Sequence, residues 1–358
     1  ATSLGYENAF LTPDVIAAFE AAGVTSEWDS SAICASLLLE KAWSVDPQRQ
    51  LSINATHAPN AKLEIDPPDF NSFAAAMDET GLKSLRPGER AEGLMLNDAS
   101  HLSASQQDTI RKILRGARQI DGSITHRVFQ ELILGSSEFN QTYNLEPFFD
   151  TESYLNKYDR PTLLATQHAF LLEWLQLPGH SGVILTNRPS RAPRGYFCTP
   201  EAEIGAHLVG FESLPIAGFG GLTWLSHTRG QSQEAYIKPS PVHALTALRL
   251  ALGDPQENAL QTAASFAVDN QRDSSWQKLQ DAQVTVFEDT TGGLESLLAA
   301  SDCLQVAGIH LEIKLFGISV NQQKRISLEA TGAQLSPTLS AALKSANIIP
   351  EMNEPLLR

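Results

Sequence analysis

The spacing of apolar residues changes near residue 160, and the two parts of the chain predict different structures. In residues 1–160, apolar side chains recur every three or four positions, as on the buried face of a helix. Helix-starting residues, such as Thr12-Pro13-Asp14 and Ser103, precede several of these segments. We expect helices at residues 13–22, 32–43, 70–77, 103–118 and 126–134. The first part therefore predicts a mainly helical region, which is either a cap beside a core sheet or a separate helical domain.

From residue 161 to 358, short apolar runs alternate with helical segments. Strands are expected at 182–185, 216–219, 284–287 and 311–318, with a last one after Gly332. Helices are expected between them, at 168–175, 201–210, 259–268 and after Pro241. Such alternation favours a parallel, doubly wound (Rossmann-like) sheet. We therefore predict an α/β protein with a large helical domain at 1–160 and an α/β core at 161–358.

The strand expected at 284–287 ends on two adjacent carboxylates, Glu288 and Asp289. Acids at the carboxyl end of a strand lie where open α/β sheets bind their ligands. Two neighbouring anions repel each other unless a cation or a fixed set of donors holds them. The pair predicts a Mg²⁺ site at a sheet edge, and the alternative is a solvated acidic turn before the next helix.

Two other segments carry groups that suit a phosphate. Thr186 follows a strand and precedes Asn187 and Arg188, so a hydroxyl, backbone N–H groups and a guanidinium are available there. Lys238 stands just before Pro239-Ser-Pro241, which is typical of a helix start. We expect this lysine at a strand-to-helix junction, where its ammonium could neutralise phosphate charge. The alternatives are an ordinary polar strand end, a surface salt bridge and a surface lysine.

Taken in order, Thr186, Lys238-Pro-Ser-Pro and Glu288-Asp289 resemble motifs two, three and four of the haloacid dehalogenase superfamily, over about residues 160–345. Most members are magnesium-dependent phosphatases, so the resemblance implies a small phosphorylated substrate. It also implies that Thr186 binds the transferring phosphoryl group and that Lys238 stabilises the nucleophile and the phosphate. Glu288 and Asp289 would hold Mg²⁺, Asp289 directly. The spacings between these motifs are longer than in compact members of the superfamily.

The nucleophile that this resemblance requires is not found. It would be the first aspartate of an Asp-x-Asp after an apolar strand, with the second acting as acid and base. The nearest segment, Leu63-Glu-Ile-Asp66-Pro-Pro-Asp69, has a different spacing and is broken by prolines. Either the nucleophile strand lies upstream of Ala1, or the fold has lost it and binds a phosphorylated ligand or a protein partner. The sequence leaves both open.

Composition excludes several classes. Charged residues make up 19% of the chain and hydrophobic ones 42%, which indicates a globular protein. The net charge of −15 opposes a nucleic-acid partner, because a phosphate backbone needs clustered Lys and Arg. No apolar run approaches the roughly 20 residues of a membrane span, so no membrane association is expected. The cysteines Cys34, Cys198 and Cys303 match no disulfide or zinc spacing, which favours a cytoplasmic location.

Overall fold

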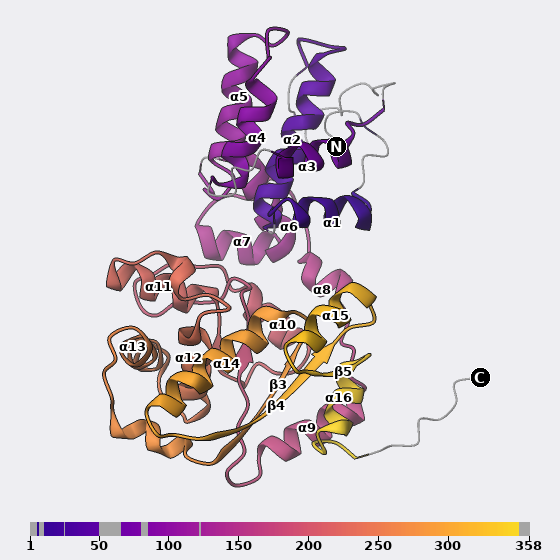
Figure 1. Cartoon of the computed structure of the whole chain (residues 1–358). Helices are drawn as coiled ribbons and strands as arrows, with labels where there is room; N and C mark the ends of the chain where they lie inside the picture. Colours follow the sequence, from indigo (N-terminus) through magenta and orange to yellow (C-terminus); the bar gives the residue numbers. More distant parts are fainter. Residues whose placement is uncertain are drawn as a thin grey trace, which may run out of the picture. The chain divides into compact units, whose positions relative to one another are not determined.

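The computed structural model divides into two compact units, Ala1–Lys157 and Tyr158–Arg358 (Figure 1). The structure describes residues 6, 11–24, 26–49, 66–79, 85–121 and 123–350. None of the helices within these residues is long and apolar enough to cross a membrane.

The N-terminal unit is helical in its described part. Its helices are α1 (Pro13–Ala21), α2 (Glu27–Trp43), α3 (Phe70–Glu79), α4 (Pro87–Leu96), α5 (Ala104–Arg115), α6 (Ile124–Leu134) and α7 (Ser136–Tyr143). The predicted helices are all present, whereas α4 and α7 were not expected. Helix α4 was not predicted because it contains two glycines, Gly88 and Gly93, which are unfavourable within a helix. Gly88 has a structural reason, because a Cβ there would overlap the backbone oxygen of Leu114 on α5.

Helix α2 forms the centre of the N-terminal core. From Ala32 to Trp43 its side chains are mostly apolar, and Ile33 and Leu39 are fully buried. They share one hydrophobic cluster with Phe19 of α1, Met77 of α3 and Ile110 of α5. A helix that is apolar on most sides must be covered on most sides, and the arrangement of its neighbours follows from that requirement.

The C-terminal unit alternates strands and helices, as the sequence predicts. Its strands are β1 (Ile184–Leu185), β2 (Ile216–Ala217), β3 (Ala282–Glu288), β4 (Leu311–Ile318) and β5 (Gln334–Ser336). Its helices are α9 (Ala165–Leu175), α10 (Glu201–Leu208), α11 (Phe219–Arg229), α12 (Pro241–Ala251), α13 (Gln256–Ala267), α14 (Thr291–Val306), α15 (Gln322–Ala330) and α16 (Leu339–Ser345). The short helix α8 (Tyr154–Tyr158) lies at the division between the units.

All pairings among the described strands are parallel, and they form two small sheets. In one, β1 pairs with β2, so that Leu185 lies opposite Ala217. In the other, the order is β3-β4-β5, with Glu288 opposite Gly317. The protein is therefore a mixed α/β protein with parallel strands. Strand β2 is shorter than expected, since Phe219 already begins α11.

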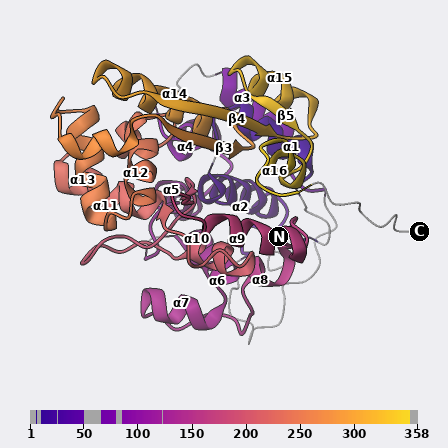
Figure 2. The ribbon, with the colours of Figure 1, turned by 90° about the horizontal axis from the view of Figure 1, so that it is seen from below.

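Helices α14 and α15 cover one face of the three-stranded sheet (Figures 1 and 2). Leu294 of α14 and Leu328 of α15 are both buried against Val286 of β3 and Leu315 of β4. Helix α12 packs beside α14 and also contacts β1 and β2. Through α12, the two small sheets are tied to the same layer of helices.

Replacement of Gly220 in α11 by alanine should destabilise the C-terminal unit. A Cβ at this position would overlap the backbone oxygen of Ser190, which cannot rotate away. We expect Gly220→Ala to lower the free energy of unfolding by about 1–3 kcal/mol. The matched control is Gly205→Ala in α10, where a Cβ would meet no atom within 4 Å. The free energy of unfolding of this control variant should rise by about 0.5–1 kcal/mol. Urea unfolding followed by tryptophan fluorescence measures both, and equal midpoints would contradict the expectation.

Candidate functional site

A buried lysine joins the carboxyl ends of β1 and β3. Lys238 Nζ donates a hydrogen bond to the carbonyl oxygen of Leu185, at 3.1 Å, and forms an ion pair with Oε1 of Glu288. The two side chains are only 9% and 10% exposed. Leu185 is the last residue of β1 and Glu288 the last of β3. Three segments that are far apart in the sequence therefore meet at one ammonium group.

Lys238 precedes a helix as predicted, but no strand comes directly before it. The residues before it form a short 3-10 helix, Gln233–Ala235, rather than a strand. After it, Ser240 caps α12, with its Oγ accepting from the N–H of Val242 at 3.3 Å. Ser296 of α14 donates to the carbonyl oxygen of Ser240 at 2.6 Å. The start of α12 is thereby fixed to α14, which follows Glu288 directly.

Thr186 lies beyond the end of β1 and is half-buried. Its N–H donates to the carbonyl oxygen of Ala217 at 3.0 Å, which extends the β1–β2 pairing by one step. Its Oγ1 accepts from the N–H of Arg188 at 3.0 Å. The hydroxyl proton of Thr186 is thus available to a ligand, because the bond to Arg188 uses only a lone pair. The side chains of Asn187 and Arg188 are exposed.

The two adjacent acids differ in their surroundings. Burial raises the pKa of the Glu288 carboxyl, and the neighbouring Lys238 opposes that shift. Asp289 is 66% exposed, and its Oδ2 lies 3.4 Å from Nζ of Lys324. A Cβ at Gly293 would overlap the Glu288 carboxylate, so the start of α14 lies directly against this side chain.

Each acid has its own lysine, and Lys324 was not identified from the sequence. It lies in the first turn of α15, and Oδ1 of the N-cap Asn321 accepts from its N–H at 3.0 Å. A lysine in a first helical turn carries no recognisable signal by itself. A general rule could have suggested it, because α15 follows β4, the strand next to β3.

The donor set at the end of β3 fits Mg²⁺ in part. Among the described residues, no three His, Cys, Asp or Glu side chains gather as they would in a metal site built from protein alone. Mg²⁺ commonly uses one or two carboxylates and takes its other ligands from water and substrate phosphate. Glu288 and Asp289 supply that minimum, and Asp289 has the more accessible oxygens.

His243 of α12 shares a hydrogen-bond acceptor with Thr186. It is fully buried, and its Nε2 lies 2.9 Å from the same Ala217 carbonyl oxygen that accepts from Thr186. A carbonyl can only accept, so Nε2 carries the proton. Burial lowers the pKa of the His243 imidazole to about 4. His243 therefore packs and positions rather than acting as a base.

The weak nucleophile candidate at residues 63–69 lies in the N-terminal unit. Residues 63–65 are outside the described residues. Asp69 stands before α3, where its carboxylate accepts from the N–H and the hydroxyl of Ser72, at 3.0 and 2.6 Å. These bonds lower the pKa of Asp69. The side chain therefore serves the start of a helix.

Comparison with known proteins supports the fold and no more. No protein-family model matches the chain, and no curated protein matches it significantly. An X-ray structure of a Northeast Structural Genomics Consortium target is similar, with a TM-score of 0.59 and 14% sequence identity. The likeness covers 93% of this chain and 82% of the other. At this identity it shows a shared α/β architecture.

The Lys238–Glu288 pair should stabilise the C-terminal unit mainly by mutual neutralisation. Lys238→Met leaves a carboxylate buried without its partner, so we expect a loss of about 3–5 kcal/mol in the free energy of unfolding at neutral pH. The double variant Lys238→Met/Glu288→Gln should regain a large part of that loss. The control Lys324→Met breaks an exposed pair and should cost under about 1 kcal/mol. A Lys238→Met loss no larger than the control's would contradict this account.

The buried His243 should make stability depend on acidity. Its pKa is about 4 when folded and about 6.5 when unfolded, so the unfolded state binds more protons between these values. Stability is thus complete above about pH 6.5 and is lost as the pH falls towards 4, by about 3 kcal/mol. His243→Gln keeps a donor for Ala217 but does not titrate. Urea unfolding at several pH values should give this variant a shallower dependence, and identical slopes would refute the assignment.

Proposed function

We propose that the C-terminal unit binds the phosphate group of a small phosphorylated metabolite beside Mg²⁺, and that it is a phosphatase-like hydrolase. The observation that carries this proposal is the contact of Lys238 with both Leu185 and Glu288. It brings together the three segments that resemble the haloacid dehalogenase motifs, because Thr186 directly follows Leu185. A common phosphate pocket requires this convergence.

Each residue has a distinct role in this proposal. The Thr186 hydroxyl and the N–H groups after it donate to the phosphate oxygens, and the exposed Arg188 side chain can pair with them. The Lys238 ammonium group neutralises part of the phosphate charge. Glu288 and Asp289 would hold Mg²⁺, which would polarise the phosphate and neutralise its charge. The helical N-terminal unit would act as the cap that excludes water.

A nucleophile would have to reach Lys238, and the strand arrangement suggests where. Among the described strands, β1 pairs only with β2, and β3 pairs only with β4. Each thus has one edge without a strand partner, and both strands end at Lys238. A parallel strand between these edges would join the two small sheets into one doubly wound sheet. Its carboxyl end would bring an aspartate to the ammonium group.

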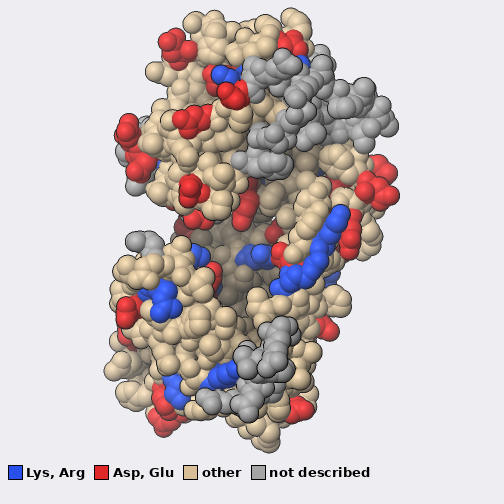
Figure 3. Space-filling model, turned by 90° about the vertical axis from the view of Figure 1, so that its right-hand side faces the viewer, with Lys and Arg blue, Asp and Glu red and all other residues tan. Residues whose placement is uncertain are grey.

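The alternative is a relative that lacks the nucleophile and binds a phosphorylated ligand or a protein partner. The position of Asp69 favours it, because this second acid of the segment at 63–69, which would have to act as acid and base, is already bonded to Ser72 at a helix start. Nucleic acid remains an unfavoured partner. On the face drawn in Figure 3, Lys and Arg side chains form one short stripe and a few small groups among acidic and uncharged surface.

A phosphate-binding measurement tests whether the C-terminal unit has the proposed site or an unrelated function. Titration of the full chain with inorganic phosphate by calorimetry should show saturable binding that strengthens with Mg²⁺. Asp289→Asn should remove most of the Mg²⁺ effect, and Thr186→Val should weaken binding by about tenfold, since hydrogen bonds to charged groups contribute about 1.5–3 kcal/mol. The control Asp302→Asn removes an exposed acid of α14 and should change neither.

A parallel assay with p-nitrophenyl phosphate distinguishes the two forms of the proposal. Magnesium-dependent turnover that Asp289→Asn reduces by 100-fold or more identifies a hydrolase. Phosphate binding without turnover identifies the binding protein. If wild type shows neither binding nor turnover, or if Asp302→Asn matches Asp289→Asn, the proposed site is wrong.

A further inference from the structure

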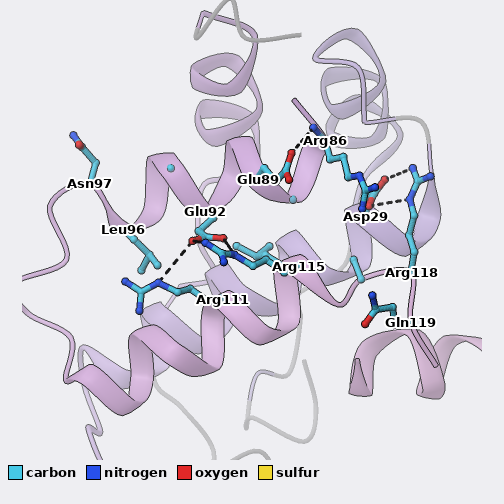
Figure 4. Close-up of a pocket in the computed structure, with 14 residues that line it drawn as sticks. Asp29, Arg86, Glu89, Glu92, Leu96, Asn97, Arg111, Arg115, Arg118 and Gln119 are labelled. Carbon is cyan, nitrogen blue, oxygen red and sulfur yellow. Dashed lines mark hydrogen bonds and ion pairs between the residues drawn. The ribbon is translucent and has the colours of Figure 1, made fainter. Parts of the chain in front are cut away.

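The N-terminal unit contains a pocket of about 620 Å³ between α4 and α5 (Figure 4). Four arginines line it, namely Arg86, Arg111, Arg115 and Arg118. Three of them follow one another at spacings of four and three residues, which places them on one side of α5 and its continuation. Arg86 comes from the opposite wall, at the start of α4. The volume is in the range of small-molecule sites.

Acidic side chains at the base of the pocket hold two of these arginines in place. Arg115 makes two bonds to Glu92, each of 2.7 Å, and Arg118 Nη2 lies 2.6 Å from Asp29 Oδ2. Glu92 is 13% exposed and Asp29 only 5%, whereas the two arginines are 66% and 51% exposed. The carboxylates therefore lie underneath, and the guanidinium groups form the accessible surface. A guanidinium has five N–H donors, so donors remain after these pairings.

The other two arginines are not neutralised in the same way. The third lining acid, Glu89, accepts from the backbone N–H of Arg86 at 3.0 Å. Arg111 donates to Oε1 of Gln107 at 3.3 Å, and its Nε lies 3.7 Å from Glu92, beyond hydrogen-bonding distance. The lining has four arginines against three acids, a surplus of one positive charge in a chain of net charge −15.

We infer that this pocket binds a small, multiply charged oxyanion of the phosphate class, such as the diphosphate group of a metabolite. Arginine forks match the spacing of phosphate oxygens, and several guanidinium groups around one space favour more than one negative charge. Gly93 lines the pocket, and a Cβ there would meet no atom within 4 Å, so this wall borders open space. The site lies wholly in the N-terminal unit and does not depend on the function proposed for the C-terminal unit.

Calorimetric titration of the full chain with pyrophosphate, without Mg²⁺ and at constant ionic strength, tests the inference. Arg111→Gln is the informative variant, since Arg111 holds neither of the close carboxylate pairs. Its matched control is Lys112→Gln, which removes the same charge one residue away, where the lysine pairs with Asp108 outside the pocket. Gly93→Leu fills the pocket while replacing a helix-interior glycine by a better helix former.

We expect saturable binding to wild type, and a Kd at least tenfold higher for both Arg111→Gln and Gly93→Leu. Lys112→Gln should change the Kd by less than twofold. Absence of saturable binding to wild type, or equal weakening by Arg111→Gln and Lys112→Gln, would overturn the inference. If Thr186→Val weakens binding and Arg111→Gln does not, pyrophosphate binds in the C-terminal unit; that result also overturns the inference and leaves the proposed function standing.

Discussion

The architecture of the C-terminal unit around its candidate site depends on a buried ion pair, Lys238 with Glu288. Neither charge is tolerated alone in an apolar interior, since desolvation of an unpaired ion costs several kcal/mol. The pairing therefore constrains where α12 can begin relative to β3, and the bond to the Leu185 carbonyl constrains β1 as well. Two small sheets that share no hydrogen bonds are held in a fixed relation by one side chain and by the helix layer behind it.

The same pair changes how the two adjacent acids are understood. From the sequence, Glu288 and Asp289 suggested a cation, because two anions side by side repel each other. The structure gives each carboxylate a lysine instead, Lys238 for the buried one and Lys324 for the exposed one. The repulsion is thus relieved by the protein itself. A magnesium ion bound through Asp289 would have to compete with Lys324, an exposed and weak pairing, whereas one that also used Glu288 would have to compete with Lys238.

Sequence patterns located the elements better than the contacts. The strand at 311–318 was predicted to the residue, because apolar residues alternate with Glu312 and Lys314 at its start and fill most of its end. The helix at 87–96 was missed, because Gly88 is there for a close approach to α5 that only the tertiary structure shows. Lys238 and Glu288 could be singled out as charged residues at element ends. That they touch could not be derived, because they are 50 positions apart and nothing in the sequence fixes the path of the chain between them.

The two candidate anion sites use opposite solutions to one electrostatic problem. A chain with a net charge of −15 repels anions at long range, so an anion must be held by short-range contacts within a Debye length of about 10 Å. The C-terminal site does this with one buried ammonium, whose charge is little screened but is already shared with Glu288. The N-terminal pocket uses several exposed guanidinium groups fixed by buried acids, each weaker but with donors to spare. Because the N-terminal pocket depends on exposed guanidinium groups, whereas the C-terminal site adds only Arg188 to the largely buried Lys238, binding to the N-terminal pocket should weaken more steeply as salt is raised.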